Sequence, residues 1–265
     1  MLHPAPLVDC HAHLDLEQFQ PDREQVIERA RAAGLVAMIC PALSADSSEA
    51  AIRLAAQHAQ IFAAVGIQPN HCAEAAAGDW DRVVELANCA RVVAIGETGL
   101  DRHWDFTPLP VQQDYFDRHL RLAQERDLPV IIHCREAEAE LMAMLREAVA
   151  RRPLCGVLHA FSGSQAMAEE CLELGLHISF AGAVSYSNKK FQPLQSVAKS
   201  IPDHRLLIET DSPYLVPEPL RGKHSRNEPA WIVHTASRLA ELRGKDLSDL
   251  ADRTTANARR LFRIQ

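Results

Sequence analysis

Six residues of this sequence carry side chains that commonly bind metal ions, and each lies at or near the end of a short apolar run. The runs are rich in Val, Ile, Leu and Ala, a composition typical of buried β-strands. The six residues are His11, His13, Glu97, His133, His159 and Asp211. Imidazole and carboxylate together suit zinc, manganese, iron or nickel better than calcium or magnesium alone. We therefore predict a divalent-metal site assembled from several separate parts of the chain.

The spacing of the first two histidines supports this prediction. His11 and His13 are separated by one residue, and residues i and i+2 of a strand point to the same side. Both imidazoles are thus expected to face one ion. An isolated histidine is more often structural than a ligand, and the other histidines of the chain are assigned that role. They include His58, His119, His177 and His234.

The size of the set favours more than one ion. Six side chains exceed the four ligands of a tetrahedral site, and they suit two ions that share a bridging carboxylate, for which Glu97 is the natural candidate. Paired divalent ions are used to hydrolyse phosphate esters and some amides, because they lower the pKa of a bound water and stabilise charge on the reacting oxygens. Asp211 is predicted to hold that water and to accept its proton.

The elements that must position these residues are expected to be parallel strands. Short apolar runs alternate with longer segments of helical period, and near-continuous apolar runs are typical of a parallel sheet covered by helices. We predict eight strands, five of which carry the candidate ligands at or near their carboxyl ends. They are 7–14, 35–42, 61–67, 92–99, 129–134, 155–161, 176–182 and 206–211.

The segments between these strands show helical periodicity. The clearest are 22–33, 47–59, 114–126, 136–150 and 165–174. The tail from Pro229 to Phe262 is predicted to form two further helices, interrupted at Gly244. The whole pattern indicates an α/β protein with one (β/α)₈ TIM-like barrel over residues 1–265 and extra C-terminal helices. The alternative is an open doubly wound sheet, but the glycine-rich turn that usually follows its first strand is missing from Asp9–His13.

Composition narrows the function classes. The net charge of −7 argues against a protein that binds nucleic acid by bulk electrostatics, so any chemistry on nucleic acid must depend on a local site. No stretch approaches the roughly 20 apolar residues of a membrane span, and Met1–Leu7 has no signal-peptide pattern. The seven scattered cysteines form no C-x-x-C pair and suit reduced, buried thiols. We expect a cytoplasmic protein with no membrane partner and no obligatory protein partner.

Basic residues near the predicted site are candidates for substrate binding. Arg135 directly follows the fifth strand, and Arg221, Lys223 and Arg226 gather in the Pro- and Gly-rich loop after the eighth. Arginine and lysine supply the donors that phosphate groups accept. The alternative is an ordinary solvated loop without a role in binding.

At these residues the sequence resembles the TatD family of metal-dependent deoxyribonucleases. The resemblance runs in order from about residue 8 to residue 262 through several motifs. They are Asp9–Asp15 (DCHAHLD), Ile95–Asp101 (IGETGLD), Pro129–Arg135 (PVIIHCR), His159–Gly163 (HAFSG), Glu209–Tyr214 (ETDSPY), Arg221–Lys223, Asn227–Pro229 and Asn257–Phe262.

The resemblance implies a TIM-like barrel of the metallo-dependent hydrolase superfamily. It implies one metal among His11, His13, Glu97 and Asp211, and a second among Glu97, His133 and His159. It also implies hydrolysis of phosphodiester bonds in DNA, by trimming single strands from 3′ to 5′. Zinc, manganese, magnesium, iron and nickel all remain open as the metal.

One segment departs from the family. Where the family often has Gly-x-His-Pro-His, this chain has Gly66-Ile67-Gln68-Pro69-Asn70, followed by His71. If the usual histidines bind DNA or move protons, this protein is expected to differ in substrate or rate.

Two other functions remain open. A metal-dependent amide or ester hydrolase of the same superfamily would need a similar site, although many such enzymes bridge their metals with a modified lysine on the fourth strand, where this chain has Glu97. A catalytically idle metal-binding protein is the third candidate, and the complete set of ligands with an acid in place argues against it.

Overall fold

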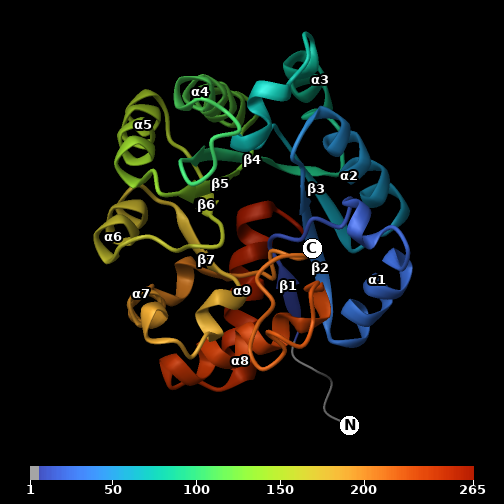
Figure 1. The fold of residues 1–265 in the computed structure, drawn as a ribbon, viewed down its shortest axis with the longest axis vertical. Coiled ribbons are helices and arrows are strands. Elements are labelled where there is room, and N and C mark those ends of the chain that lie inside the picture. Colours follow the sequence, from blue (N-terminus) through green and yellow to red (C-terminus); the bar gives the residue numbers. More distant parts are fainter. Residues whose placement is uncertain (1–5) are drawn as a thin grey trace.

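The computed structural model describes residues 6–265. Eight parallel strands form one sheet in the order β1-β2-β3-β4-β5-β6-β7-β8, and helices surround it (Figure 1). The strands are β1 Leu7–Asp9, β2 Leu35–Pro41, β3 Ile61–Val65, β4 Val92–Asp101, β5 Val130–Arg135, β6 Gly156–Leu158, β7 His177–Phe180 and β8 Leu206–Ile208. The predicted (β/α)₈ TIM-like barrel is confirmed.

The first and last strands, β1 and β8, are joined by residues that directly follow them. The Cys10 amide donates to the carbonyl of Ile208 at 3.2 Å, and Ala12 and Ser212 form an isolated parallel bridge. The Asp211 amide donates to the carbonyl of His11 at 2.9 Å. These bonds close the barrel with the same residues that carry the candidate ligands.

Several strands are shorter than predicted. The predicted strand 7–14 ends at Asp9, the strand 155–161 ends at Leu158, and the strand 206–211 ends at Ile208. The backbone leaves the regular ladder at these ends, where the candidate ligands follow. Strand β4 is longer than predicted at its carboxyl end, because it continues to Asp101.

The helices agree with the sequence periodicity in the main. Those covering the sheet are α1 Arg23–Ala32, α2 Ala45–Gln57, α3 Asp79–Leu86, α4 Leu109–Arg126, α5 Glu138–Arg151, α6 Gln165–Glu173, α7 Gln192–Ser200 and α8 Ile232–Arg243. Helix α2 begins earlier than predicted, because the Ser44 side chain caps it by accepting from the Ser47 amide. The sequence analysis did not identify α3 and α7, which have eight and nine residues. Such short helices depend on packing more than on their own propensity.

The C-terminal helix α9, Leu247–Phe262, closes the amino end of the barrel. Gly244, with φ +61°, separates it from α8, as predicted. Its last residues pack against side chains that fill the barrel interior, and Figure 1 shows α9 within the ring of strands. This interior cluster includes Val8, Ile39, Ala64, Ile131, Val157, Leu207, Leu261, Phe262 and Ile264. A second, larger cluster joins the outer faces of the strands to the surrounding helices.

The structure bears on the expectations about a membrane span, a signal peptide and the cysteines. Within residues 6–265, no helix is both long enough and apolar enough to cross a bilayer. The prediction about a signal peptide falls mainly on residues 1–5, outside the described part of the chain. All seven cysteines are free thiols, but the expectation that they are buried holds for only four of them: Cys89, Cys134 and Cys155 are partly exposed.

Candidate metal centre

The six predicted ligands converge at the carboxyl end of the barrel, around the carboxylate of Glu97. One of its oxygens, Oε2, lies 3.3 Å from Nε2 of His11 and 3.5 Å from Nε2 of His13. Oδ1 of Asp211 lies 3.7 Å from both imidazole nitrogens. These four side chains form one half of the cluster.

The other oxygen of Glu97 faces a different pair of imidazoles. Oε1 lies 3.0 Å from Nδ1 of His133 and 3.2 Å from Nε2 of His159. Those two nitrogens are 3.2 Å apart. Glu97 thus divides the cluster, with one oxygen toward each set of imidazoles.

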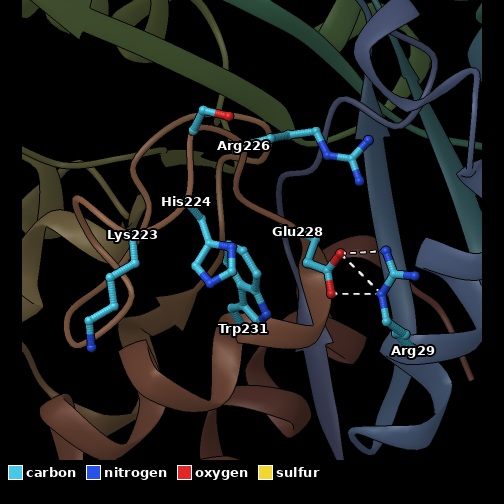
Figure 2. Close-up of a pocket in the computed structure, with 7 residues that line it drawn as sticks. Arg29, Lys223, His224, Arg226, Glu228 and Trp231 are labelled. Carbon is cyan, nitrogen blue, oxygen red and sulfur yellow. Dashed lines mark hydrogen bonds and ion pairs between the residues drawn. The ribbon is translucent and has the colours of Figure 1, made fainter.

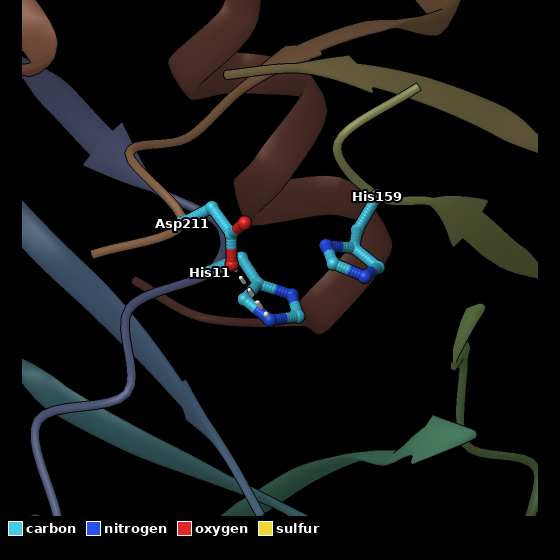
Figure 3. Close-up of side chains that lie close together, drawn as sticks. All are labelled: His11, His159 and Asp211. Atoms are coloured by element: carbon cyan, nitrogen blue, oxygen red, sulfur yellow. Dashed lines mark ion pairs between the residues drawn. The ribbon is translucent and has the colours of Figure 1, made fainter. Parts of the chain in front are cut away.

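Asp211 and the stacked histidines join the two halves. The rings of His11 and His159 stack with centroids 3.9 Å apart, and Asp211 reaches toward His11 from the loop after β8 (Figure 3). Asp211 has φ +54°, a left-handed conformation that costs a residue with a side chain on the order of 1–2 kcal/mol. The backbone bond to His11 holds it there, so the chain maintains a strained residue at the site.

Outer hydrogen bonds orient three of the four imidazoles. Nδ1 of His13 lies 3.2 Å from the carbonyl oxygen of Pro41, which can only accept. Nε2 of His133 lies 3.0 Å from Asp101, and Nδ1 of His159 lies 3.3 Å from Glu209. When each of these nitrogens donates a proton outward, the other nitrogen of the neutral ring directs its lone pair into the cluster.

This arrangement fits a cation. In the neutral tautomers set by the outer partners, His13, His133 and His159 direct lone pairs at the oxygens of Glu97 and Asp211 over 3.0–3.7 Å, with no proton between them. Such a group of acceptors is repulsive unless positive charge lies among them. Nδ1 of His11 is buried without a hydrogen-bond partner. Carboxylate and imidazole are also the donors that divalent transition metals prefer, so these residues fit the expected group.

The pKa shifts indicate the same need for positive charge, because burial would lower the pKa of His159 but Glu97 and Glu209 outweigh it and raise this pKa well above its usual value. Burial would raise the pKa of Glu97, but the imidazoles of His159, His11 and His133 outweigh it and hold that pKa well below its usual value. Burial raises the pKa of Asp211 to about 8, although His159 opposes the rise. Burial lowers the pKa of His11 to about 4. A cation would favour the ionised form of Asp211, because it stabilises the nearby negative charge.

Gly99 allows β4 and β5 to approach closely beside the cluster. It has φ +135°, and a Cβ atom at this position would lie 2.0 Å from the carbonyl oxygen of His133. Any side chain here would displace the backbone that carries His133. The glycine of the GETG segment therefore has a steric role in placing a ligand.

The positions of the ligands differ in detail from the prediction. His11, His13, His159 and Asp211 follow their strands, and Glu97 lies inside β4. The i, i+2 argument for His11 and His13 assumed a continuous strand, whereas β1 ends at Asp9. Their Nε2 atoms are nevertheless 3.1 Å apart, because the bridge between Ala12 and Ser212 keeps this segment extended.

Three carboxylates that the sequence analysis left without a role support the cluster. Asp9 accepts from the Thr210 hydroxyl at 2.6 Å and from the His11 amide at 3.1 Å. Asp101 and Glu209 accept from His133 and His159, and the pKa of Asp101 falls to about 2 because hydrogen bonding to His133 outweighs its burial. These carboxylates could have been recognised in the sequence, because each lies two or four positions from a candidate ligand.

The segment that departs from the family contacts this outer layer. Asn70 donates to Oδ2 of Asp101 at 3.1 Å, and Oε1 of Gln68 accepts from the Asn70 amide at 2.8 Å. His71 turns instead toward Glu74 at the surface. Asn70 is thus one carboxylate removed from His133, a position from which it can influence the site without touching a metal.

The predicted substrate-binding residues have different surroundings. Arg135, Arg221 and Lys223 are exposed, and within residues 6–265 no carboxylate lies within 4.0 Å of their charged groups. Arg221 lies over the ring of Tyr186 at 4.0 Å. Arg226 donates to Asp22 at 2.7 and 2.8 Å and to the Gln18 carbonyl.

A pocket of about 450 Å³ lies beside this loop, away from the ligand cluster (Figure 2). Its wall includes the ion pair between Arg29 and Glu228 and the contact between His224 and Trp231. Lys223 and Arg226 also line it. Glu228 pairs with Arg29 and Asp22 pairs with Arg226, so Lys223 supplies the positive charge of this wall that has no carboxylate partner among residues 6–265.

Comparison with known proteins adds an independent finding. The family model described as TatD related DNase matches residues 8–263. A Bacillus subtilis protein called uncharacterized metal-dependent hydrolase YabD is 40% identical over 97% of this chain and 99% of its own length. The Erwinia amylovora protein called 3′-5′ ssDNA/RNA exonuclease TatD is 39% identical over 97% and 99%.

Solved structures agree with the fold. The TatD homologue YJJV from Escherichia coli K12 superposes with a TM-score of 0.90 and 30% identity, covering 98% of each chain. An uncharacterized amidohydrolase from Saccharomyces cerevisiae has a TM-score of 0.85 at 19% identity, which shows the shared fold alone. With a family match over nearly the whole chain and the ligand cluster in place, this protein belongs to the TatD family of metal-dependent hydrolases.

Proposed function

We propose that this hydrolase cleaves phosphodiester bonds of single-stranded nucleic acid, DNA above all, and that it trims from the 3′ end. The observation that carries the proposal is the Glu97-centred cluster in a chain 39% identical to a protein named for that activity. The chain offers the full set of imidazoles and carboxylates that such a reaction requires.

Two divalent ions are the proposed cofactors. His11, His13, Glu97 and Asp211 would hold one ion, and Glu97, His133 and His159 would hold the other, since the two oxygens of Glu97 face different imidazoles. Divalent ions in such a site lower the pKa of water and stabilise negative charge on phosphoryl oxygens. Asp101 and Glu209 would keep the neutral tautomers of His133 and His159 in place.

Asp211 is the proposed proton acceptor. Water attacks the phosphorus while the bond to the leaving sugar oxygen breaks; the attacking water loses a proton as its oxygen bonds to phosphorus, and the leaving oxygen takes up a proton from solvent. The Asp211 carboxylate borders the cluster and lies against the imidazoles, so it can take that proton once ionised. Glu97 acts by holding the two halves of the site at a fixed separation.

Exposed cations are the proposed phosphate contacts. Arg135, Arg221 and Lys223 offer donors at the carboxyl end of the barrel. Arg226 belongs to the same group in the sequence, but we assign it the smallest share because Asp22 already pairs with it. With a net charge of −7, binding would depend on these few contacts rather than on a general positive field.

We also propose that residues 1–265 act as one unit in the cytoplasm. Seven free cysteines suit a reducing compartment. The chain covers 97–100% of the length of several proteins named TatD exonucleases.

The test uses metal-depleted protein. It is incubated with Mn²⁺, Mg²⁺ or Zn²⁺ and with single-stranded DNA labelled at the 5′ or the 3′ end, single-stranded RNA, and a panel of carboxylic esters and amides. We expect metal-dependent shortening of single strands from the 3′ end. Turnover of esters or amides with intact nucleic acid would instead favour the amide or ester hydrolase, and metal binding without any turnover would favour the idle metal-binding protein.

A further inference from the structure

Exposed aromatic side chains gather beside the metal centre. In the described chain, five large apolar side chains are exposed, and three of them are aromatic: Trp104, Phe106 and Tyr214. Trp104 and Phe106 are 45% and 61% exposed and follow the carboxyl end of β4, whereas Tyr214 follows Asp211. Exposed rings are unfavourable in water, and their concentration at the end that carries the ligands suggests a binding surface.

Two of these rings stack on one another. The rings of Trp104 and Phe106 lie 5.5 Å apart and only 7° from parallel. The guanidinium of Arg135 lies 5.7 Å from the centre of the Trp104 ring. We call Trp104, Phe106 and Arg135 the aromatic shelf; in it the exposed Phe106 ring stacks on Trp104, beside one positive charge that has no carboxylate partner in the described chain.

The loop that carries the shelf is fixed at both ends. Buried Gln112 donates to the carbonyls of Asp101 and Thr107 at 2.9 and 2.8 Å, and its oxygen accepts from the Asp101 amide at 2.8 Å. The Thr107 hydroxyl accepts from the Ala73 amide. The rings are therefore exposed on an anchored loop, so little conformational entropy remains to be lost when a ligand binds.

The shelf is also coupled in position to the metal centre. Pairing of β4 with β5 continues through Gly99–His133 and Asp101–Arg135, beyond the last pair of β5 with β6 at Ile132. Asp101 accepts from the Trp104 amide at 3.3 Å and from His133, which contacts Glu97. One carboxylate and one imidazole thus separate the backbone of the shelf from the bridging Glu97.

We propose that unpaired nucleobases stack on the aromatic shelf while Arg135 contacts an adjacent phosphate. Every base has a π face, so stacking tolerates any sequence, and it supplies affinity that does not depend on bulk charge. A base inside a duplex has both faces covered by its neighbours, so the shelf favours single strands with unstacked bases. This inference rests on the proposed function and assigns residues to its preference for single strands.

Charge favours a nucleic acid over a second copy of this chain as the occupant. The shelf adds an unpaired arginine to its rings, and a polyanion complements it, whereas the chain itself is an anion of −7. The test below includes self-association as an outcome.

Binding without turnover is the first measurement. Metal-depleted protein is titrated with a ten-nucleotide deoxythymidine oligomer and with an abasic oligomer of equal length, which keeps the phosphates but has no bases. We expect the wild type to bind the thymidine oligomer on the order of ten to a hundred times more tightly. Trp104→Ala and Phe106→Ala should each lose most of that ratio. The Trp104→Ala variant keeps the backbone amide that donates to Asp101, so the support of His133 is retained.

The matched control is Leu247→Ala at the start of α9, which removes another exposed apolar side chain far along the chain from the shelf. It should keep the wild-type ratio. Equal ratios in wild type, Trp104→Ala and Phe106→Ala would overturn the proposal. So would a shelf-dependent dimer in sedimentation together with no preference for bases.

Cleavage separates failure of the shelf from failure of the proposed function. Metal-loaded wild type, Trp104→Ala and Leu247→Ala are assayed on both oligomers, and we expect the ratio of kcat/KM values to fall toward one only in Trp104→Ala, mainly through KM. Equal losses on both oligomers would indicate a structural effect and contradict the shelf. If the wild type cleaves neither oligomer, the proposed function fails, while the binding ratio still decides whether bases stack on the shelf.

Discussion

The two ends of the barrel use the same strands for opposite purposes. At the amino end, α9 covers an apolar interior in which Val8, Ile131 and Phe262 are almost fully buried. At the carboxyl end, His11 and Glu97 are buried to the same degree, yet they are polar or charged. Burying such groups without compensating charge is unfavourable. The contrast indicates that apolar burial at the amino end stabilises the fold. Burial of polar groups at the carboxyl end lowers the stability of the fold but forms the candidate metal site.

The contrast extends to the backbone. At the carboxyl end, Ala160 and Asp211, with φ +41° and +54°, occupy the left-handed region although neither is glycine. Each lies next to or at a candidate ligand. At the amino end, Arg263 is also left-handed, with φ +53°, but it ends α9 between Phe262 and Ile264 and adjoins no candidate ligand. Changes at the two ends should therefore separate activity from stability.

The largest expected effect is on the rate. Asp211→Asn keeps the size of the side chain but removes its capacity to accept a proton, so we expect kcat to fall by about two to four orders of magnitude. Much of the bound metal should remain, at least the ion assigned to His133 and His159. Metal content and kcat are measured on the same preparation. Near-wild-type turnover would remove Asp211 from the mechanism and leave it a structural ligand.

At the amino end, the expected effect is on stability. Phe262→Ala should lower the free energy of unfolding by about 3–5 kcal/mol, because it leaves a cavity where α9 meets the barrel interior. Urea unfolding measures this loss, and kcat is measured at a temperature where the variant is folded. The comparison predicts unchanged kcat and metal content. A stable variant with greatly reduced kcat would show that the two ends are not separable.

A buried histidine outside the ligand cluster sharpens the contrast. His119 on α4 accepts from the Ile67 amide through Nε2 and lies 2.6 Å from the Tyr115 carbonyl through Nδ1, so its neutral ring has partners on both sides. Burial lowers its pKa to about 4 from 6.5. Between these values the unfolded chain binds the proton more tightly, so this group makes stability fall as pH drops, by about 1.4 kcal/mol per pH unit.

Replacing this histidine should flatten that dependence. We expect His119→Gln to be less stable than wild type at pH 7 but to lose less further stability between pH 6.5 and pH 4.5. Urea unfolding at several pH values compares the two slopes. If they are equal, His119 does not remain neutral in the folded protein.

The smallest expected effect is on the salt dependence of DNA binding, and it distinguishes two arginines of the loop after β8. Arg221 is exposed and lies over Tyr186, whereas Arg226 is paired with Asp22, whose pKa falls to about 2 mainly because of that bond. Arg221→Gln should make binding of single-stranded DNA less dependent on salt, by about 0.7 in the log–log slope. Arg226→Gln should change the slope less. A larger change for Arg226 would reverse the assignment of phosphate contacts.

Much of the fold and the ligand set could be predicted from the sequence. The alternation of apolar runs and helical segments indicated the barrel, because a parallel sheet needs strands buried on both faces. The candidate ligands were recognisable because His11, Glu97 and Asp211 are polar residues within or directly after such runs.

Other features depend on contacts between distant segments. Asp22 pairs with Arg226 across 204 positions, and Asp9 accepts from Thr210 across 201. No local pattern reveals such partners. The parallel rings of Trp104 and Phe106 depend on how Gln112 holds their loop. Short helices such as α3 and α7 also escaped detection, since their stability comes from packing.

The central claim is that Glu97 joins two ions into one site. Its most direct test is the metal content of purified wild type, Glu97→Ala and His133→Ala after saturation with Mn²⁺ or Zn²⁺ and removal of free metal. The geometry predicts two ions per chain in the wild type, loss of both in Glu97→Ala, and loss mainly of the second ion in His133→Ala. A folded Glu97→Ala variant that keeps both ions would contradict the account.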